Sequence, residues 1–464
     1  AKTHTDTFLK NATFAKHRLT PEVLFIGAES RLLAEKPDYA VADAFYRRLV
    51  TEHAMHAQVP QAGLRIGFCL YSTKKYDEAV AHLTKLAPTL KQPAQTAETQ
   101  LLIGRSHSEA KRHPQATAAF RLALTADPKW SRADEALFLL AVSLRNQKDA
   151  KNATTELTRL TTQHKESRYL DQAFFQLGEI SLDEKQYDVA VMHYRKVATT
   201  FPKSDLASSA LYGSATALFE KGDFPNVAVD VAKLLTAYPQ SDGAKRGRYL
   251  RGMSYRRVKN FAAAVTDLTA FLASKPAEAD ALTAQFELAL CHVGLKQHDQ
   301  AVTALNAILK TKPDYEQADA VYYELGFAYL AGKKPKEAAT AFQSLAAKSP
   351  ESPLVAESWF RVGEFHEQAA AALTGEEAAT ARKTALVEAG KAFTLGLAKV
   401  KASELKERLY YKLGWIQFEQ DAFADAAKSF QALTAAFPKG DYAPESVYMS
   451  GESLYRQKNY TAAL

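Results

Sequence analysis

The sequence of 464 residues predicts an all-α fold, a solenoid of about twelve helix-turn-helix repeats with a period of 37 residues. Three kinds of residue recur at fixed places in this period: a small residue, a large apolar residue 16 positions later and a proline 24 positions later. We call the small residue the anchor and number the other positions of each repeat from it as phases. Because one two-helix repeat is too thin to bury its own apolar faces, consecutive repeats are expected to stack and share a core.

The anchors are glycine or alanine in every repeat. They are spaced by 37 residues from Gly67 to Gly363, while the first step measures 40 residues and the step after Gly363 measures 51. In chain order they are Gly27, Gly67, Gly104, Ala141, Gly178, Ala215, Gly252, Ala289, Gly326, Gly363, Gly414 and Gly451. A small anchor allows a neighbouring helix to approach closely, and a large side chain at phase +16, such as Phe120 or Tyr194, then fills the space.

The second helix of each repeat and its end are marked in the same way. Around Ala215, apolar residues 3 or 4 positions apart, from Phe224 to Leu234, predict an amphipathic helix. Proline at phase +24 ends the second helix, because it lacks an amide hydrogen and has a fixed φ. It occurs at Pro128, Pro202, Pro239, Pro276, Pro313, Pro350 and Pro438. The polar residue that follows, here Ser241 or Asp242, is expected to cap the next first helix.

Three parts of the chain depart from the regular repeat. Residues 1–19 are expected to be helical and to cap the solenoid that residues 20–464 form. The 14 additional residues between Gly363 and Gly414 predict an elongated helical hairpin at about 354–400. The last repeat is incomplete, since the sequence stops inside its second helix, and we expect either a longer natural chain or another chain that covers this end.

The composition is that of a folded protein, with 47% hydrophobic and 24% charged residues, and no apolar run is long enough to span a membrane. The net charge of +7 is compatible with an acidic partner, and we expect no nucleic acid partner. The sequence starts with Ala1 instead of methionine, which indicates either a removed targeting segment, and therefore export, or a trimmed chain.

No residue pattern predicts catalysis, a cofactor or a metal site. Cys69 and Cys291 lie six repeats apart at a phase otherwise held mainly by serine and alanine, so we expect buried core residues and no disulfide. His107, His292 and His366 share phase +3 with tyrosines, which indicates packing. The sequence contains no glycine-rich phosphate loop, metalloprotease helix or nucleophile elbow. We therefore do not expect an enzyme.

Glycine at the anchor, alanine at phase +12, phenylalanine or leucine at +16 and proline at +24 together resemble the tetratricopeptide repeat (TPR), whose usual period is about 34 residues. The resemblance covers residues from about 20 to 464. The additional residues fall in the joint between repeats, for which FPKS at 201–204 is typical. This lengthened form is similar to bacterial envelope TPR proteins of the Tol-Pal coordinator type and the outer-membrane assembly lipoprotein type.

The resemblance implies a right-handed superhelix in which the first helices line a concave groove for a protein or peptide partner, without catalysis. It also implies a periplasmic or otherwise exported protein, with a cytoplasmic location as the alternative. We therefore expect a protein-binding scaffold. Two other functions stay open: a polysaccharide-associated export scaffold, and the regulatory TPR arm of a larger enzyme.

A ladder of aromatic residues is the first candidate partner-binding feature. Phase −3 is aromatic in nine consecutive repeats, at Phe138, Phe175, Tyr212, Tyr249, Phe286, Tyr323, Phe360, Tyr411 and Tyr448. If this phase faces the groove, the ladder holds an extended peptide or stacks on sugars. In the alternative, each ring packs on the adjacent first helix. The rings that we assign to partner binding are Phe175, Tyr212, Tyr249, Phe286 and Tyr323.

A basic segment is the second candidate. Residues 245–260, KRGRYLRGMSYRRVKN, contain seven lysines or arginines and no acid. Arg246, Arg256 and Arg257 fall on the same helix stripe as Tyr249, whereas other arginines of the segment fall off it. Arginines on one face beside an aromatic ring suit carboxylates or other anions. In the alternative, the segment is a solvated face that acids of neighbouring repeats, such as Glu220, compensate.

Overall fold

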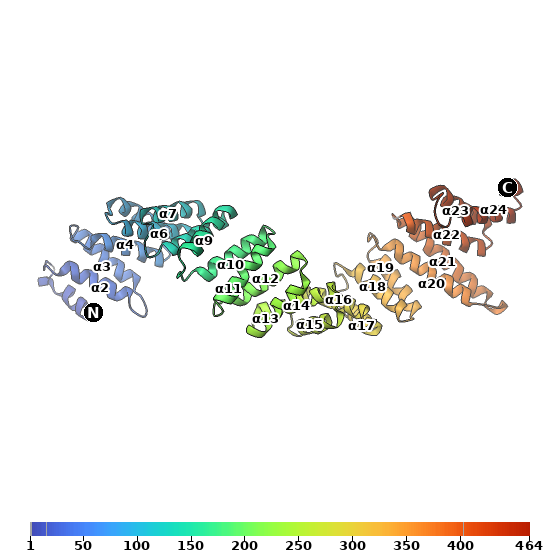
Figure 1. The fold of residues 1–464 in the computed structure, drawn as a ribbon, viewed down its shortest axis with the longest axis horizontal. Helices are drawn as coiled ribbons and strands as arrows, with labels where there is room; N and C mark the ends of the chain where they lie inside the picture. Colours follow the sequence, from blue (N-terminus) through green and yellow to red (C-terminus); the bar gives the residue numbers. More distant parts are fainter. Residues whose placement is uncertain (1, 15, 402) are drawn as a thin grey trace. The chain divides into compact units, whose positions relative to one another are not determined.

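The computed structural model describes residues 2–14, 16–401 and 403–464. Within these residues all regular elements are helices, and successive helices from α1 to α12 and from α14 to α25 pack side by side (Figure 1). Contacts between Cα atoms divide the chain into two compact units. Unit 1 comprises residues 1–223 and 236–238, and unit 2 comprises residues 224–235 and 239–464. The predicted all-α architecture of stacked helical hairpins is confirmed in each unit.

In unit 1, from α2 onward, the first helices of the repeats have even numbers and the second helices have odd numbers. The helices are α1 (Lys2–Lys10), α2 (Thr20–Leu32), α3 (Tyr39–Glu52), α4 (Val59–Ser72), α5 (Tyr76–Leu86), α6 (Pro93–Glu109), α7 (His113–Ala126), α8 (Ala133–Asn146), α9 (Ala150–Gln163), α10 (Leu170–Asp183), α11 (Tyr187–Thr200) and α12 (Ala207–Lys221). Two short 3₁₀ turns, η1 (Ala12–Phe14) and η2 (Ala87–Thr89), follow α1 and α5.

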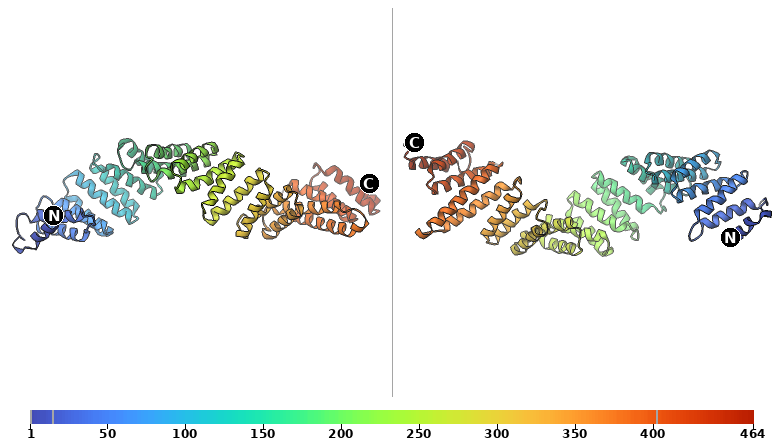
Figure 2. Two further views of the ribbon diagram at one scale, coloured as in Figure 1. Left: turned by 90° about the horizontal axis from the view of Figure 1, so that it is seen from below. Right: turned by 180° about the vertical axis from the view of Figure 1, so that it is seen from behind.

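Unit 2 continues the same alternation, and its helices from α14 onward pack in chain order, as two further views show (Figure 2). Its helices are α13 (Phe224–Ala237), whose end is assigned to unit 1, α14 (Asp242–Arg257), α15 (Phe261–Ala273), α16 (Glu278–Gly294), α17 (His298–Thr311), α18 (Ala318–Ala331), α19 (Pro335–Lys348), α20 (Val355–Ala372), α21 (Ala379–Lys399), α22 (Ser403–Glu419), α23 (Phe423–Ala436), α24 (Ala443–Arg456) and α25 (Tyr460–Ala463). A 3₁₀ turn, η3 (Glu376–Ala378), precedes α21.

The anchor and the phase +16 side chain are in contact within a repeat, as the sequence pattern predicts. A Cβ atom added to Gly326 would lie 2.5 Å from the ring of Phe342, and one added to Gly178 would lie 2.7 Å from the ring of Tyr194. Such approaches are impossible for real atoms, so glycine is required beside these rings. Where the anchor is alanine, as at Ala141, the phase +16 residue is aliphatic. The anchor and the phase +16 side chain are therefore matched in size.

The joint between repeats is held by a bond that the sequence pattern did not predict. At the start of α14, Ser241 caps the helix as expected, since its hydroxyl accepts from the amide of Ala244 at 3.1 Å. The serine at the same phase in the preceding joint instead donates to an acid of the previous first helix: Ser204 Oγ lies 2.5 Å from Asp171 Oδ2. The pairs Ser167–Asp134 and Ser352–Asp319 repeat this bond, both at 2.6 Å.

In ten repeats, those from Gly67 to Gly326 and those of Gly414 and Gly451, the turn closes on a left-handed residue at phase +7. In the repeat of Gly67 this residue is Lys74, with φ of 61°, and its amide donates to the carbonyl of Tyr71 at 2.9 Å. Glycine is the usual residue at such a helix end, and it is found at Gly222. A side chain in the left-handed region costs about 1 kcal/mol. The turn therefore contains a small, recurrent strain.

The additional residues after Gly363 are divided between the two helices of this repeat and the turn that joins them. The second helix α21 has 21 residues, whereas the second helices α13, α15, α17, α19 and α23 have 13 or 14. The first helix α20 has 18 residues, against 14 to 17 in the first helices α16, α18 and α22. The two helices are thus lengthened unequally, α21 more than α20.

At the other end of the chain, α1 lies against α2, where Asp6 pairs with the buried Arg31. No helix within the described residues is long and apolar enough to cross a bilayer.

Candidate functional site

In unit 1, two hollows lie along the face of the first helices that the sequence assigns to the groove. One hollow lies between α4 and α6 and is lined by Gln61, Leu64, Arg65, Phe68, Ala94, Gln95, Glu98 and Leu102. The other lies beside α10 and is lined by Phe138, Asp171, Gln172, Phe175, Gln176, Ser204, Asp205 and Leu206. Both contain the residues at phases −6 and −3 of one first helix and the start of the next. The predicted partner-binding ring Phe175 is thus at a hollow.

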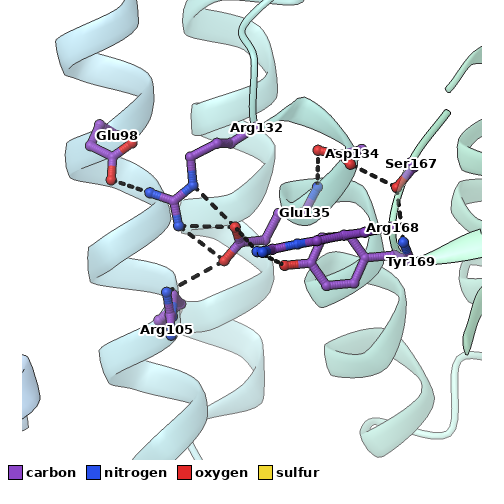
Figure 3. A network of polar contacts seen from close by, with 8 residues as sticks. All are labelled: Glu98, Arg105, Arg132, Asp134, Glu135, Ser167, Arg168 and Tyr169. Atoms are coloured by element: carbon purple, nitrogen blue, oxygen red, sulfur yellow. Dashed lines mark hydrogen bonds and ion pairs between the residues drawn. The ribbon is translucent and has the colours of Figure 1, made fainter. Parts of the chain in front are cut away.

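Between these hollows, three arginines surround one buried carboxylate (Figure 3). Glu135, on α8, is only 5% exposed. Arg132 donates to both of its oxygens at 2.9 to 3.1 Å. Arg105, on α6, lies 3.4 Å from Glu135 Oε1, and Arg168, before α10, lies 3.5 Å from Oε2. We call these residues, with Glu98, the Glu135 cluster.

The Glu135 cluster has an excess of positive charge. Its three guanidinium groups face two carboxylates, because Glu98 also accepts from Arg132. Burial alone would lower the pKa of Arg132, but the adjacent Glu98 and Glu135 more than offset this and raise it. Arg168 is held against Tyr169 by a hydrogen bond of 2.6 Å, yet its side chain is 75% exposed. A partner carboxylate can therefore reach a guanidinium whose position is already fixed.

The sequence analysis missed the Glu135 cluster, because its members come from three repeats. Arg105, Arg132 and Arg168 occupy three different phases, so no local run of charge marks them. Of the three, only Arg105 lies within a first helix, since Arg132 and Arg168 precede α8 and α10.

The aromatic ladder packs largely between and within repeats. The ring of Phe138 stacks on Tyr169 of the next repeat at 5.2 Å, and Tyr411 meets Tyr442 of its next repeat at 4.4 Å. Tyr448 stands in the last repeat of the chain and is 68% exposed. The half-buried rings are Phe175, Tyr212, Tyr249, Phe286, Tyr323 and Tyr411. Their role in partner binding stays a prediction, restricted to the ring edges that packing leaves open.

Two of the arginines in the basic segment of α14 are engaged by acids. Arg251 donates to both oxygens of Asp267 at 2.6 and 2.8 Å, and Asp267 is 2% exposed. Arg256 pairs with the buried Glu287 of the next repeat. Desolvation raises the pKa of Glu287, an effect that Arg256 partly offsets. The acids that pair with cations of this segment are therefore Asp267, Glu287 and, for Lys245, Asp242.

The other two predicted arginines differ from Arg256. Arg246 and Arg257 are exposed, and neither forms an ion pair with any residue in the described part of the chain. Arg257 still lies close enough to Glu287 to help lower its pKa. Burial raises the pKa of Tyr249, on the same helix, to about 12. The predicted site thus has two guanidinium groups with an open side and one that is bound to Glu287.

The cysteines and histidines show no arrangement for chemistry. Burial raises the pKa of the Cys69 thiol to about 12 and that of Cys291 to about 11, so neither forms a reactive thiolate at neutral pH. His107 accepts from Arg112 at 3.0 Å, and His292 bonds Gln297 at 2.7 Å. Among the residues that the structure describes, no three potential metal ligands come together.

Comparisons with protein families agree with the repeat pattern. Family models described as tetratricopeptide repeat match residues 61–87, 135–167, 283–315, 320–352 and 410–464. The YfiO model, described as an outer membrane lipoprotein, matches residues 170–286. A search among curated protein sequences gives no match.

Solved structures of TPR proteins are similar to the chain. A TPR protein from Parabacteroides merdae is 16% identical, with a TM-score of 0.38 over 62% of this chain and 100% of that chain. The C-terminal part of a TPR repeat-containing protein from Cytophaga hutchinsonii is 12% identical, with a TM-score of 0.45 over 59% and 98%. YrrB, a TPR protein with an unusual peptide-binding site, is 17% identical, with a TM-score of 0.36 over 44% and 97%.

Proposed function

We propose that this chain, a TPR solenoid resembling bacterial envelope TPR proteins, is a non-enzymatic scaffold that binds an acidic partner polypeptide along its first helices. TPR proteins are protein-interaction scaffolds in general. The observation that carries the proposal for this chain is an excess of guanidinium groups on the first-helix face. It occurs independently in both units.

In unit 2, the proposed contact is formed by Arg246 and Arg257. Both have an exposed side chain on α14 that forms no ion pair in the described part of the chain, and Glu287 holds Arg256 beside them. The open edge of Tyr249 lies on the same helix stripe. Arginine and tyrosine are the residues that most often dominate the free energy of protein association. An acidic segment of the partner is the ligand that this combination fits.

In unit 1, the proposed contact is formed by the exposed guanidinium of Arg168 and by the two hollows. Each hollow has apolar side chains in its lining, among them Phe68 and Phe175, beside charged ones such as Arg65 and Asp171. The Glu135 cluster lies between them along the row of first helices. This order fits an extended peptide that has an acidic residue between two apolar ones. Sugar stacking is less favoured, because it needs open ring faces, and most ladder rings are packed.

The proposed location is the bacterial cell envelope. The match of residues 170–286 to an outer membrane lipoprotein family supports it, as does the aromatic-Pro-x-Ser joint. Fractionation of the natural protein from its source tests the location. Recovery in the periplasm or with outer membranes is expected, and recovery in the cytoplasm would contradict it.

Photo-crosslinking along the two faces of a repeat tests the binding mode. A crosslinker in place of Thr283, on the first helix α16, is expected to capture a partner polypeptide from an extract of the source cells. A matched crosslinker in place of Thr266, exposed on the second helix α15, is the control and should not capture it. The captured polypeptide, once purified, should bind the unmodified chain. Equal capture from both faces, or none from Thr283, would refute binding by the first helices.

A further inference from the structure

We propose that in each unit the edge of the helical hairpins opposite the joints is a second interaction surface, which binds anionic lipid headgroups through a row of lysines. The row consists of the left-handed residues at phase +7. In unit 1 they are Lys74, Lys111, Lys148 and Lys185, and in unit 2 they are Lys259, Lys296, Lys333 and Lys458. This proposal is independent of partner binding by the first helices.

The first argument is that lysine is an unfavourable choice at this backbone position. The φ angles of the unit 1 lysines are 58° to 62°, in the region where glycine, and then asparagine or aspartate, are preferred. Gly222 and Asp421 occupy the same phase in other repeats, so the turn accepts the preferred residues. A residue that strains the backbone in one repeat after another points to a role outside the fold.

The second argument is that these lysines have no role within the fold that the structure shows. All eight are exposed, and none forms an ion pair with any residue in the described part of the chain. Cations next to this phase, by contrast, do form ion pairs. Arg112 pairs with Asp77 at 2.5 Å, Lys221 pairs with Asp188 at 2.6 Å, and Lys334 pairs with Asp299 at 2.9 Å. The phase +7 ammonium groups are therefore unpaired beside cations that are paired.

A favourable interaction with the end of the first helix does not account for the lysines. A cation near the last carbonyl groups of a helix is stabilising. One turn of the chain combines such a cation with an unstrained backbone: Lys221 is the last residue of α12, and Gly222 takes the left-handed position after it. In two other turns, a second cation next to the row is already present: Arg112 follows Lys111, and Lys334 follows Lys333. The lysine at phase +7 is additional to what the helix end needs.

The geometry of the row favours a lipid surface as the partner. All turns within repeats lie at one end of the helical hairpins, and all joints lie at the other, so the row runs along one edge. Its members are one repeat apart, so each offers a single ammonium group, and exposed acids at the same turns, such as Asp77 and Asp188, pair with neighbouring cations. Ammonium groups on flexible stems suit partners whose charges can move. Headgroups that diffuse within an anionic membrane meet this condition.

Sedimentation with vesicles tests the proposal on the full chain. Binding to phosphatidylcholine vesicles that contain phosphatidylglycerol is expected at low ionic strength, and binding to pure phosphatidylcholine is not. The quadruple variant K74G/K111G/K148G/K185G should lose on the order of a hundredfold in affinity. Glycine suits the left-handed region, so this variant should have a raised melting temperature. A loss of binding then cannot result from unfolding.

The matched control removes four exposed lysines from the opposite edge of unit 1. The variant K91Q/K129Q/K165Q/K203Q changes the net charge equally and should keep its affinity within a few fold. Replacement of the four row lysines by arginine should also preserve binding. The proposal is overturned if the two quadruple variants lose affinity equally, or if the unmodified chain does not bind anionic vesicles. It is also overturned if the row is needed for binding soluble polyglutamate but not vesicles, because the partner would then be an acidic polymer.

Discussion

The two arginine-rich places of the molecule are organised differently. In unit 2, the arginines follow one another on a single helix, α14, and the acids come from elsewhere: Asp267 from the same repeat and Glu287 from the next. In unit 1, the arginines themselves come from three repeats and converge on one acid, Glu135. The comparison teaches that a local run of arginines overestimates how many of them are free to bind a partner, because acids of other helices in the stack pair with some of them. A site whose residues come from several repeats does not appear as a local pattern in the sequence.

Removal of the central carboxylate should have the largest effect, and it should be larger in unit 1. The variant E135Q leaves three guanidinium groups around an uncharged side chain, and we expect a loss of about 4 kcal/mol in the free energy of unfolding. The variant E287Q should change the free energy of unfolding by less than about 1 kcal/mol, because the burial of this carboxylate offsets its attraction to the partly exposed Arg256. Urea denaturation measures both. An equal loss in the two variants would show that the two places do not differ as described.

The partly exposed Glu98 provides a control within the same cluster. The variant E98Q removes a carboxylate that shares Arg132 with Glu135, and it should lose less than about 1 kcal/mol. A loss as large as that of E135Q would mean that burial is not what distinguishes the two acids.

The lysine row provides a third kind of cation, which neither pairs nor packs. The variant K148G should gain about 0.5 to 1 kcal/mol in the free energy of unfolding, because glycine relieves the left-handed strain. The control K196G lies in the interior of helix α11, where glycine should instead lose about 1 kcal/mol. A loss in K148G would show that this lysine contributes to the fold.

The pH dependence of stability should show the smallest effect, and it concerns Glu287. Burial raises the pKa of Glu287 above its usual value of 4.5 in the folded chain. A raised pKa in the folded state gives a contribution to stability that is complete below the usual pKa and is lost as the pH rises through the folded pKa. The unmodified chain should therefore lose stability relative to E287Q between pH 4.5 and neutrality. Parallel profiles would contradict the desolvation of this carboxylate.

Features that depend on one phase of the repeat were predictable from the sequence. Gly326 and Phe342 recur in register with the other anchors and their phase +16 partners, and the structure places them in contact. The lysines at phase +7 were equally periodic, but nothing in their residue type indicates a left-handed backbone. The left-handed conformation of these lysines is seen only in the φ angles of the structure.

Features that depend on stacking were not predictable. The pairing of Arg256 with Glu287 needs the exact rotation between two first helices, because the pair spans 31 residues. The bond between Ser204 and Asp171 depends likewise on how the joint folds back onto the previous repeat. The family resemblance gave the direction of the first helices but not which of their arginines would be engaged.

The affinity of the purified partner polypeptide for charge-reversed chains tests the central claim most directly. The variant R246E/R257E should lose at least about tenfold in affinity, with unchanged stability, because both side chains are exposed and unpaired in the described structure. The control R248E changes an arginine of the same helix that lies off the stripe, and it should bind as the unmodified chain does. Unchanged affinity of R246E/R257E, or an equal loss in R248E, would contradict the account.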